Sequence, residues 1–165
     1  MTAPSPPGRL LLVPTPLDHG CTPQTPITDV LPLGTLRAAA RITHWISENA
    51  KSTRAFLKRV DAVAPLAQPV QAHTITELPR AVHKKGDHDP TSSPADARPL
   101  LAAAMQGQDV GLVSEAGMPA VADPGSSVVR AAHELGLAVV PLVGPVSILL
   151  ALAASGLNGQ NFAFV

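Results

Sequence analysis

Short apolar runs alternate along this chain with amphipathic segments. Residues 110–113 form one unbroken apolar run, which suits a strand buried on both faces of a sheet. Residues 70–75 alternate between apolar and polar positions, which indicates a strand with one buried face. On these patterns, strands are predicted over residues 9–13, 44–48, 70–75, 109–113 and 138–143.

Helical spacing and helix-capping residues fill the intervals between these strands. After Pro32, apolar residues recur on one helix face. Ser93 and Asp123 each stand directly before a proline, an arrangement that favours a capped first helical turn. Helices are predicted from Pro32, over residues 52–60, from Ser93 to a stop at Gly107, from Asp123 to a stop at Gly136, and over residues 146–154 before Gly156.

The alternation of strands and helices predicts an α/β fold. We expect a doubly wound, mostly parallel five-stranded sheet with helices on both faces, formed by residues 9–157. The Pro-rich residues 1–8 are expected to be disordered. Residues 158–165 are expected to form a linker, and residues 161–165 within it the first strand of a further domain.

Composition narrows the functional classes. Apolar residues make up 45% of the chain and aromatic residues only 2%, so the core must be aliphatic. Lys and Arg number 12, as do Asp and Glu, so no overall field favours nucleic acid or an anionic membrane, although a local patch remains open. Cys21 is the single cysteine, which excludes an intramolecular disulfide. The chain shows neither a signal-peptide layout nor an apolar run of membrane-spanning length, so a cytoplasmic, non-membrane protein is expected.

Residues 114–125 make a loop that is long for a simple connection. Gly117 and Pro119 fix an irregular backbone just beyond the predicted fourth strand, where open α/β sheets bind their ligands. A second junction of this kind follows at residues 139–147. The alternative, a connection built only from turn residues, explains residues 123–125 but not residues 114–119. The pattern therefore favours a small-molecule site.

Several common sites are disfavoured by spacing. No Gly-x-Gly-x-x-Gly follows the first strand, no Walker-type phosphate loop is present, and Ser114 lacks the glycine spacing of a nucleophile elbow. A metal cluster is open to consideration, but its residues have no helical or zinc-knuckle spacing, so a solvated loop is favoured and no metal is predicted. The residues of that cluster are His83, Asp87, His88 and Asp89.

Four segments carry a family resemblance. Residues 12–17 are similar to a Val-Pro-Thr-Pro-Ile loop, and residues 47–49 with 53–54 to Ala-Glu-Asp-Thr-Arg. Residues 112–125 resemble Leu-Val-Ser-Asp-Ala-Gly-Thr-Pro followed by Asp-Pro-Gly, and residues 139–156 resemble Val-Val-Pro-Leu-Pro-Gly-Pro with its small-residue helix. These motifs are those of the N-terminal domain of the tetrapyrrole methylase superfamily, the class III S-adenosylmethionine (SAM) methyltransferases. The likeness is greatest to the bacterial 16S rRNA 2′-O-ribose methyltransferase I group.

The resemblance implies a function and a cofactor. It implies methyl transfer from SAM to an acceptor, for which a ribose 2′-hydroxyl of rRNA in the 30S subunit is the leading choice, and it implies a cytoplasmic homodimer. A methylase of porphyrin- or corrin-type tetrapyrroles and a non-catalytic SAM-binding or dimerisation module remain alternatives. The cofactor-binding positions that it implies are Leu17, Gly117, Met118, Pro119, Val121, Gly144, Val146 and Ser147.

One carboxylate is a candidate for the chemistry. A 2′-hydroxyl acceptor needs a proton acceptor in the transition state, and Glu48 matches an acidic position of the family. A strand-end carboxylate that only faces water is the favoured alternative for Glu48. The chain also departs from the family motifs, with Glu115 for the usual Asp, Val143 for Pro and Met118 for Thr. Since Met118 lacks the hydroxyl, an altered cofactor affinity is expected.

Overall fold

A computed structural model describes residues 6–18, 21–79 and 97–163. Its five strands form one sheet in the order β3-β2-β4-β1-β5, and every neighbouring pair is parallel. The doubly wound α/β prediction is thereby confirmed. The strands are β1 (Arg9–Leu12), β2 (His44–Ser47), β3 (Thr74–Glu77), β4 (Val110–Val113) and β5 (Ala138–Pro141).

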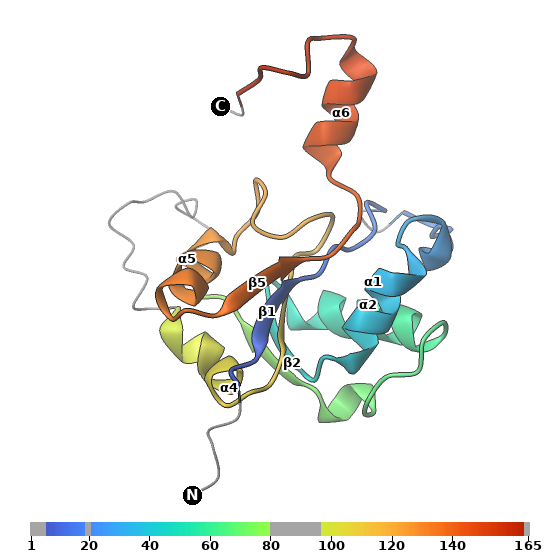
Figure 1. The fold of residues 1–165 in the computed structure, drawn as a ribbon. Helices are drawn as coiled ribbons and strands as arrows, with labels where there is room; N and C mark the ends of the chain where they lie inside the picture. Colours follow the sequence, from blue (N-terminus) through green and yellow to red (C-terminus); the bar gives the residue numbers. More distant parts are fainter. Residues whose placement is uncertain (1–5, 19–20, 80–96, 164–165) are drawn as a thin grey trace, which may run out of the picture.

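Helices cover both faces of the sheet (Figure 1). Helices α1 and α2 pack on one face, while α4 and α5 pack on the other. Between them run short 3-10 turns, η1 (Ile27–Asp29), η2 (Val70–Ala72) and η4 (Arg98–Leu101). The helices are α1 (Leu33–Arg41), α2 (Ala50–Asp61), α4 (Ala102–Met105), α5 (Ser126–Glu134) and α6 (Ser147–Ser155).

Alternation along the strands divides the core into two halves. Leu11 and Trp45 face the layer of α1 and α2, while Leu10 and Ile46 face the layer of α4 and α5. All four residues of β4 are buried, as its unbroken apolar run predicts for a central strand. The core is therefore largely aliphatic, as expected from the composition.

Element boundaries differ from the predictions where turn chemistry intervenes. The predicted strand over residues 70–75 is wrong in its first half, because residues 70–72 form η2 after Pro69 and the strand begins only at Thr74. Helix α2 begins at Ala50, before the predicted position 52, because the Asn49 side chain accepts hydrogen bonds from the backbone N–H groups of Lys51 and Ser52.

Helix α5 begins later than its predicted start at Asp123. Its N-cap is Gly125, with φ of 130°, because the preceding loop keeps Ala122 in a left-handed conformation that no α-helix accommodates. Gly107, Gly136 and Gly156 all have positive φ at helix ends, as their predicted role as stops requires. The predicted start at Ser93 lies outside the described residues.

The ends of the domain also differ from expectation. Gly8 belongs to the folded domain, since it is buried and its N–H donates to the Ala104 carbonyl at 2.8 Å. Helix α6 stands away from the sheet, and none of its residues is buried (Figure 1). Residues 161–163 form no strand in the structure, and residues 164–165 lie outside the described residues, so the strand expected over 161–165 stays a prediction. None of the described helices is long and apolar enough to cross a membrane.

An ion pair at the start of the sheet gives a pH prediction. The Arg9 guanidinium donates to the Asp109 carboxylate at 2.6 Å, and this hydrogen bond lowers the pKa of Asp109. A carboxyl whose folded pKa is lowered stabilises the fold above its unfolded pKa of about 4, and this stability is lost as the pH falls through the folded value. Because the pair lies at the surface, we expect a loss below about 1 kcal/mol. Urea unfolding at pH 7 and at pH 3 measures this loss of stability. In Asp109→Asn, the free energy of unfolding should differ less between the two pH values than it does in wild type. An unchanged difference would contradict the assignment.

Candidate functional site

The loops after β1 and β4 are joined at the carboxyl edge of the sheet. Thr15 N–H donates to the Gly117 carbonyl at 2.9 Å, and Gly117 N–H donates to the Thr15 carbonyl at 3.1 Å. The Thr15 hydroxyl also donates to the Ser114 carbonyl at 3.4 Å. These bonds hold the long loop of residues 114–125 over the neighbouring strand.

The loop after β5 meets the same junction. A Cβ on Gly117 would lie 3.0 Å from Leu17 Cδ2 and 3.6 Å from the Pro145 carbonyl oxygen. A Cβ on Gly144 would lie 2.3 Å from Pro14 Cγ, which is a severe overlap. Glycine at position 144 therefore makes room for Pro14, and glycine at position 117 makes room for the Leu17 side chain.

The third loop is also fixed from the helical layer. The Thr35 hydroxyl of α1 donates to the Val143 carbonyl at 2.7 Å, and Thr35 is buried. Loops from β1, β4 and β5 thus meet at one edge, where the sequence places a ligand site.

The predicted cofactor positions lie in these loops, except for Ser147, which is the first residue of α6. Leu17, Gly117 and Gly144 take part in the close approach described above. Met118, Pro119 and Val121 lie in the loop after β4, and Val146 and Ser147 stand at the start of α6. Contact of all these positions with a cofactor stays a prediction. Gly117 and Pro119 are buried, Val121 and Ser147 are exposed, and Leu17, Met118, Gly144 and Val146 are partly buried.

The loop after β4 stores backbone strain. Ala120 and Ala122 have φ of 63° and 58°, a left-handed conformation that residues with a Cβ rarely adopt. Strain of this kind persists where the surrounding structure imposes it, and it gathers at binding sites. A mere connector would not need it, so this observation favours the ligand-loop interpretation.

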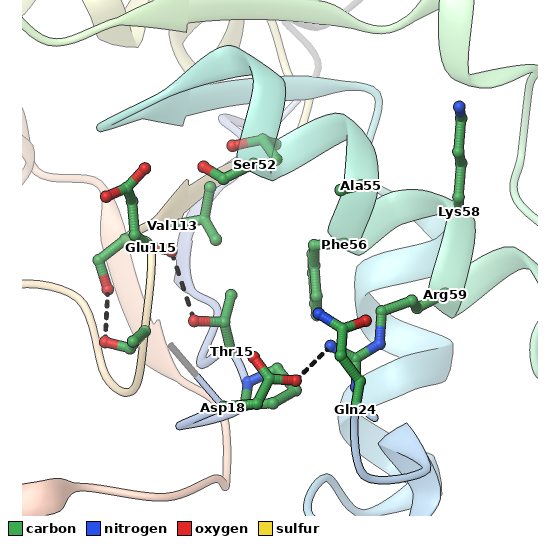
Figure 2. A pocket seen from close by; sticks show the side chains of 14 residues that line it. Thr15, Asp18, Gln24, Ser52, Ala55, Phe56, Lys58, Arg59, Val113 and Glu115 are labelled. Atoms are coloured by element: carbon green, nitrogen blue, oxygen red, sulfur yellow. Dashed lines mark hydrogen bonds and ion pairs between the residues drawn. The ribbon is translucent and has the colours of Figure 1, made fainter. Parts of the chain in front are cut away.

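A cavity of about 560 Å³ opens beside this junction, on the side of α2 (Figure 2). None of the predicted cofactor positions lines it. Its walls come from the loops after β1 and β4 and from one side of α2, segments that lie far apart in the sequence. The lining side chains that bear on its chemistry are Thr15, Asp18, Ser52, Phe56, Lys58, Arg59, Ser114 and Glu115.

An ion pair closes one wall of the cavity. An Arg59 guanidinium N–H donates to Asp18 Oδ2 at 2.7 Å, and the two side chains are only 22% and 17% exposed. A second N–H of Arg59 donates to the Thr25 carbonyl at 2.8 Å. Arg59 therefore holds the loop after β1 against α2. No sequence pattern predicts this pairing, although the basic residues of α2 are visible in the sequence.

Glu48 lies at the carboxyl end of β2 and bonds to the neighbouring loop. Its Oε2 accepts from the Glu115 backbone N–H at 3.2 Å, and its own N–H donates to the Val113 carbonyl at 3.3 Å. Its side chain is thus more than a carboxylate that faces water, because it fixes the first residues of the loop after β4. Its role as a proton acceptor stays a prediction.

Replacing Glu48 separates its structural contact from its charge. Glu48→Ala should lower the free energy of unfolding by about 1 kcal/mol, because the Glu115 N–H loses its acceptor. Glu48→Gln is the matched control, since its amide oxygen can still accept this bond, and it should unfold close to wild type. Urea unfolding of both variants measures the effect. Equal losses in the two variants would contradict the structural role.

The described residues contain no group of three or more His, Cys, Asp or Glu side chains that could hold a metal ion. The candidate cluster of His83, Asp87, His88 and Asp89 lies outside those residues. Cys21 is an exposed free thiol.

The fold defines the chain as a doubly wound α/β domain, and its loops after β1, β4 and β5 meet at the carboxyl ends of the strands, the edge where domains of this class bind their ligands. Comparison with known proteins shows which members of this class the chain resembles. The chain is similar to proteins named Ribosomal RNA small subunit methyltransferase I from several bacteria. The resemblance expected from the sequence motifs is thereby confirmed.

The similarity covers part of each protein. The chain is 46% identical over 68 residues to the protein of Escherichia coli O157:H7, a match that covers 41% of this chain and 24% of that relative. It is 50% identical over 70 residues to the protein of Mesorhizobium japonicum, which covers 42% of this chain and 24% of that relative. The matched part thus spans about a quarter of the length of these relatives. No protein-family model matches the chain.

Proposed function

We propose that this chain is the SAM-binding domain of a methyltransferase that modifies rRNA, with a ribose 2′-hydroxyl as the acceptor. The observation that carries the proposal is the junction at Gly117, where the loops after β1, β4 and β5 meet. The relatives named as rRNA methyltransferases support the choice of reaction. Residues 9–157 would form this domain, and residues 158–165 would lead to a further one.

The side chains and backbone at this junction suit SAM. Leu17, Met118 and Val121 offer apolar surface for the adenosine, and the Gly117 backbone has no side chain to keep a ligand away. Ser147 could donate its hydroxyl to a ribose or carboxylate oxygen. SAM would supply a methyl group already activated on a sulfonium.

The protein's part in such a reaction is mainly alignment. The loops would hold donor and acceptor in line and exclude water, since positioning supplies most of the catalysis in a transfer of this kind. Glu48 would accept the proton of the 2′-hydroxyl. The hydrogen bond from the Glu115 N–H to its carboxylate would hold the side chain in place at the carboxyl end of β2.

A SAM titration tests the cofactor. Isothermal calorimetry of the chain with SAM, and with its demethylated product S-adenosylhomocysteine, should show saturable binding at one site. ATP should give no saturable heat, because no phosphate-binding loop is present. Absence of binding at millimolar SAM would overturn the proposal. Transfer of tritiated methyl groups to 30S subunits by the full gene product tests the acceptor, and a tetrapyrrole assay run in parallel tests the alternative one.

A non-catalytic dimerisation module remains the second candidate, and helix α6 favours it. Leu149 and Leu150 of this helix are 49% and 56% exposed, and no residue of α6 is buried. A homodimer would cover such a surface. Sedimentation of the chain together with the SAM titration separates the two: a dimer that does not bind SAM supports the module, and binding of SAM supports the enzyme.

A further inference from the structure

Helix α2 concentrates positive charge beside the cavity. It carries Lys51, Arg54, Lys58 and Arg59 but only one acidic residue, Asp61, in a chain whose net charge is +0. Arg59 donates hydrogen bonds to Asp18 and to the Thr25 carbonyl, as described above. The other three basic residues are exposed and have the spacing of neighbours along one helix face.

These three residues, Lys51, Arg54 and Lys58, are called the cationic stripe. Within the part of the chain that the structure describes, none of them forms a salt bridge. The Arg54 guanidinium donates to the Ala50 carbonyl of its own helix, at 3.4 Å. Lys58 extends away from the Arg59–Asp18 pair at the edge of the cavity (Figure 2).

Helix stability does not explain the stripe. Like charges three and four residues apart repel each other on a helix surface. Lys51 also lies in the first turn, where the helix dipole disfavours a cation and where α2 has no acidic residue. The backbone N–H groups of that turn have acceptors within the protein. The Asn49 side chain accepts from Lys51 and Ser52, and the Glu77 carboxylate accepts from Ala50. Lys58, in contrast, lies in the last turn, where the helix dipole favours a cation. The repulsion between the three charges and the position of Lys51 therefore destabilise α2, and an anionic ligand would offset both effects.

The cavity beside the stripe has the chemistry of a sugar site. The hydroxyls of Thr15, Ser52 and Ser114 line it. Each donates its own proton to a backbone carbonyl, so its oxygen is left to accept. The Glu115 carboxylate can likewise accept from a ribose hydroxyl. Phe56, which is only 5% exposed, closes the floor of the cavity with the edge of the core. The stripe extends over about 10 Å at 1.5 Å per residue, close to the length of three nucleotides of a stacked strand.

We propose that the cationic stripe and the cavity of α2 bind the sugar-phosphate backbone of the RNA strand that carries the methyl acceptor. The stripe contacts phosphates, and the cavity receives one ribose. This inference rests on the proposed function for the identity of the reaction. It assigns the acceptor to the α2 side of the Thr15–Gly117 junction, and the cofactor to the loops after β1, β4 and β5.

Fluorescence anisotropy with a short fluorescein-labelled single-stranded RNA tests the stripe. In the triple variant Lys51→Ala, Arg54→Ala and Lys58→Ala, we expect the Kd to rise at least about tenfold. The slope of log affinity against log salt should fall by about 0.7 for each phosphate that the variant no longer neutralises. Arg130→Ala is the matched control, because Arg130 is an exposed basic residue of α5 on the opposite face of the sheet, and it should bind as wild type. Wild-type binding by the triple variant, or an equal weakening in the control, would overturn the proposal.

A second variant tests the cavity. Ala55 is exposed on α2 and lines the cavity, so Ala55→Trp should fill it without disturbing the core. We expect Ala55→Trp to weaken RNA binding about tenfold and to remove any preference for RNA over DNA of the same sequence, while Ala55→Ser keeps both. Far-UV circular dichroism verifies that each variant is folded. Unchanged RNA affinity in folded Ala55→Trp would show that no ribose enters the cavity.

The SAM titration separates this inference from the proposed function. The triple variant should bind SAM as wild type does, because the stripe lies apart from the predicted cofactor positions. If SAM binds but the triple variant binds RNA as tightly as wild type does, only the present inference fails. If RNA binding depends on the stripe but SAM does not bind, the proposed reaction fails and the RNA surface stands. Loss of SAM binding in the triple variant would place the cofactor in the cavity and overturn the assignment made here.

Discussion

Gly111→Ala is expected to destabilise the domain by about 2–4 kcal/mol, through overpacking and the strain it places on a buried hydrogen bond. A Cβ at this position of β4 would lie 2.7 Å from Trp45 Cε3 and Cζ3 and 3.3 Å from Ile42 Cδ1. Trp45 is 1% exposed, so its ring has no free space to enter. Its indole N–H also donates to His73 Nδ1 at 3.1 Å, and a shift of the ring would break this bond.

The chain provides its own reporter and control for this experiment. Trp45 is the only tryptophan, so its fluorescence during urea unfolding reports directly on the contact. Gly34→Ala is the matched control, because a Cβ at Gly34 meets nothing within 4 Å and lies in α1. There alanine should stabilise by about 0.5–1 kcal/mol. Similar midpoints for the two variants would show that the indole does not lie against Gly111.

A double variant identifies the ring as the cause. Trp45→Leu alone removes a buried ring and its hydrogen bond, and it should destabilise the domain. Combined with Gly111→Ala, however, the loss of stability should be smaller than the sum of the two single losses, because leucine leaves room for the new methyl group. Urea unfolding of Trp45→Leu and of the double variant is followed by circular dichroism, since both lack the tryptophan. Strict additivity would contradict the packing described here.

The second large effect concerns ligand binding at Gly117. Gly117→Ala should raise the Kd for SAM at least about tenfold and destabilise the fold by about 1–2 kcal/mol, because φ of 73° is left-handed. Its new Cβ would lie 3.0 Å from Leu17 Cδ2, so it would displace the Leu17 side chain, itself a predicted cofactor position. Calorimetry measures the Kd for SAM, and urea unfolding measures the loss of stability.

Gly136→Ala is the control that isolates the junction. Gly136 has almost the same backbone strain, with φ of 70°, but a Cβ there meets nothing within 4 Å. This variant should therefore lose similar stability and still bind SAM as wild type does. If both variants bind SAM equally well, the junction at Gly117 does not form the cofactor site.

Sequence pattern predicted the parts of this fold that are encoded locally. The apolar run of β4 and the glycine stops after the helices of the sheet layers needed no knowledge of distant residues. The third strand was misplaced because Pro69 sets a 3-10 turn over residues whose alternation resembles a strand. The start of α5 was misplaced because the strained conformation of Ala122 cannot be read from an alanine.

The candidate site was predicted only in part, for a similar reason. The loops that meet at Gly117 carry their own glycine and proline signals, so each was visible in the sequence. The cavity depends instead on Arg59 and Asp18, which are 41 residues apart and pair only through the fold. The Glu48 carboxylate likewise meets the Glu115 N–H across 67 residues. Side-chain pairing over such distances leaves no local pattern.

The place of β4 in the sheet has a consequence for how the chain acquires its structure. β4 lies between β2 and β1, so β1 and β2, which are both synthesised before β4, have no direct pairing with each other. A nascent chain that ends before residue 110 can pair β2 with β3, but both neighbours of β1 in the sheet, β4 and β5, are then still to be synthesised. Assembly of the sheet is therefore a late and non-local event, and slow folding is expected from such a topology.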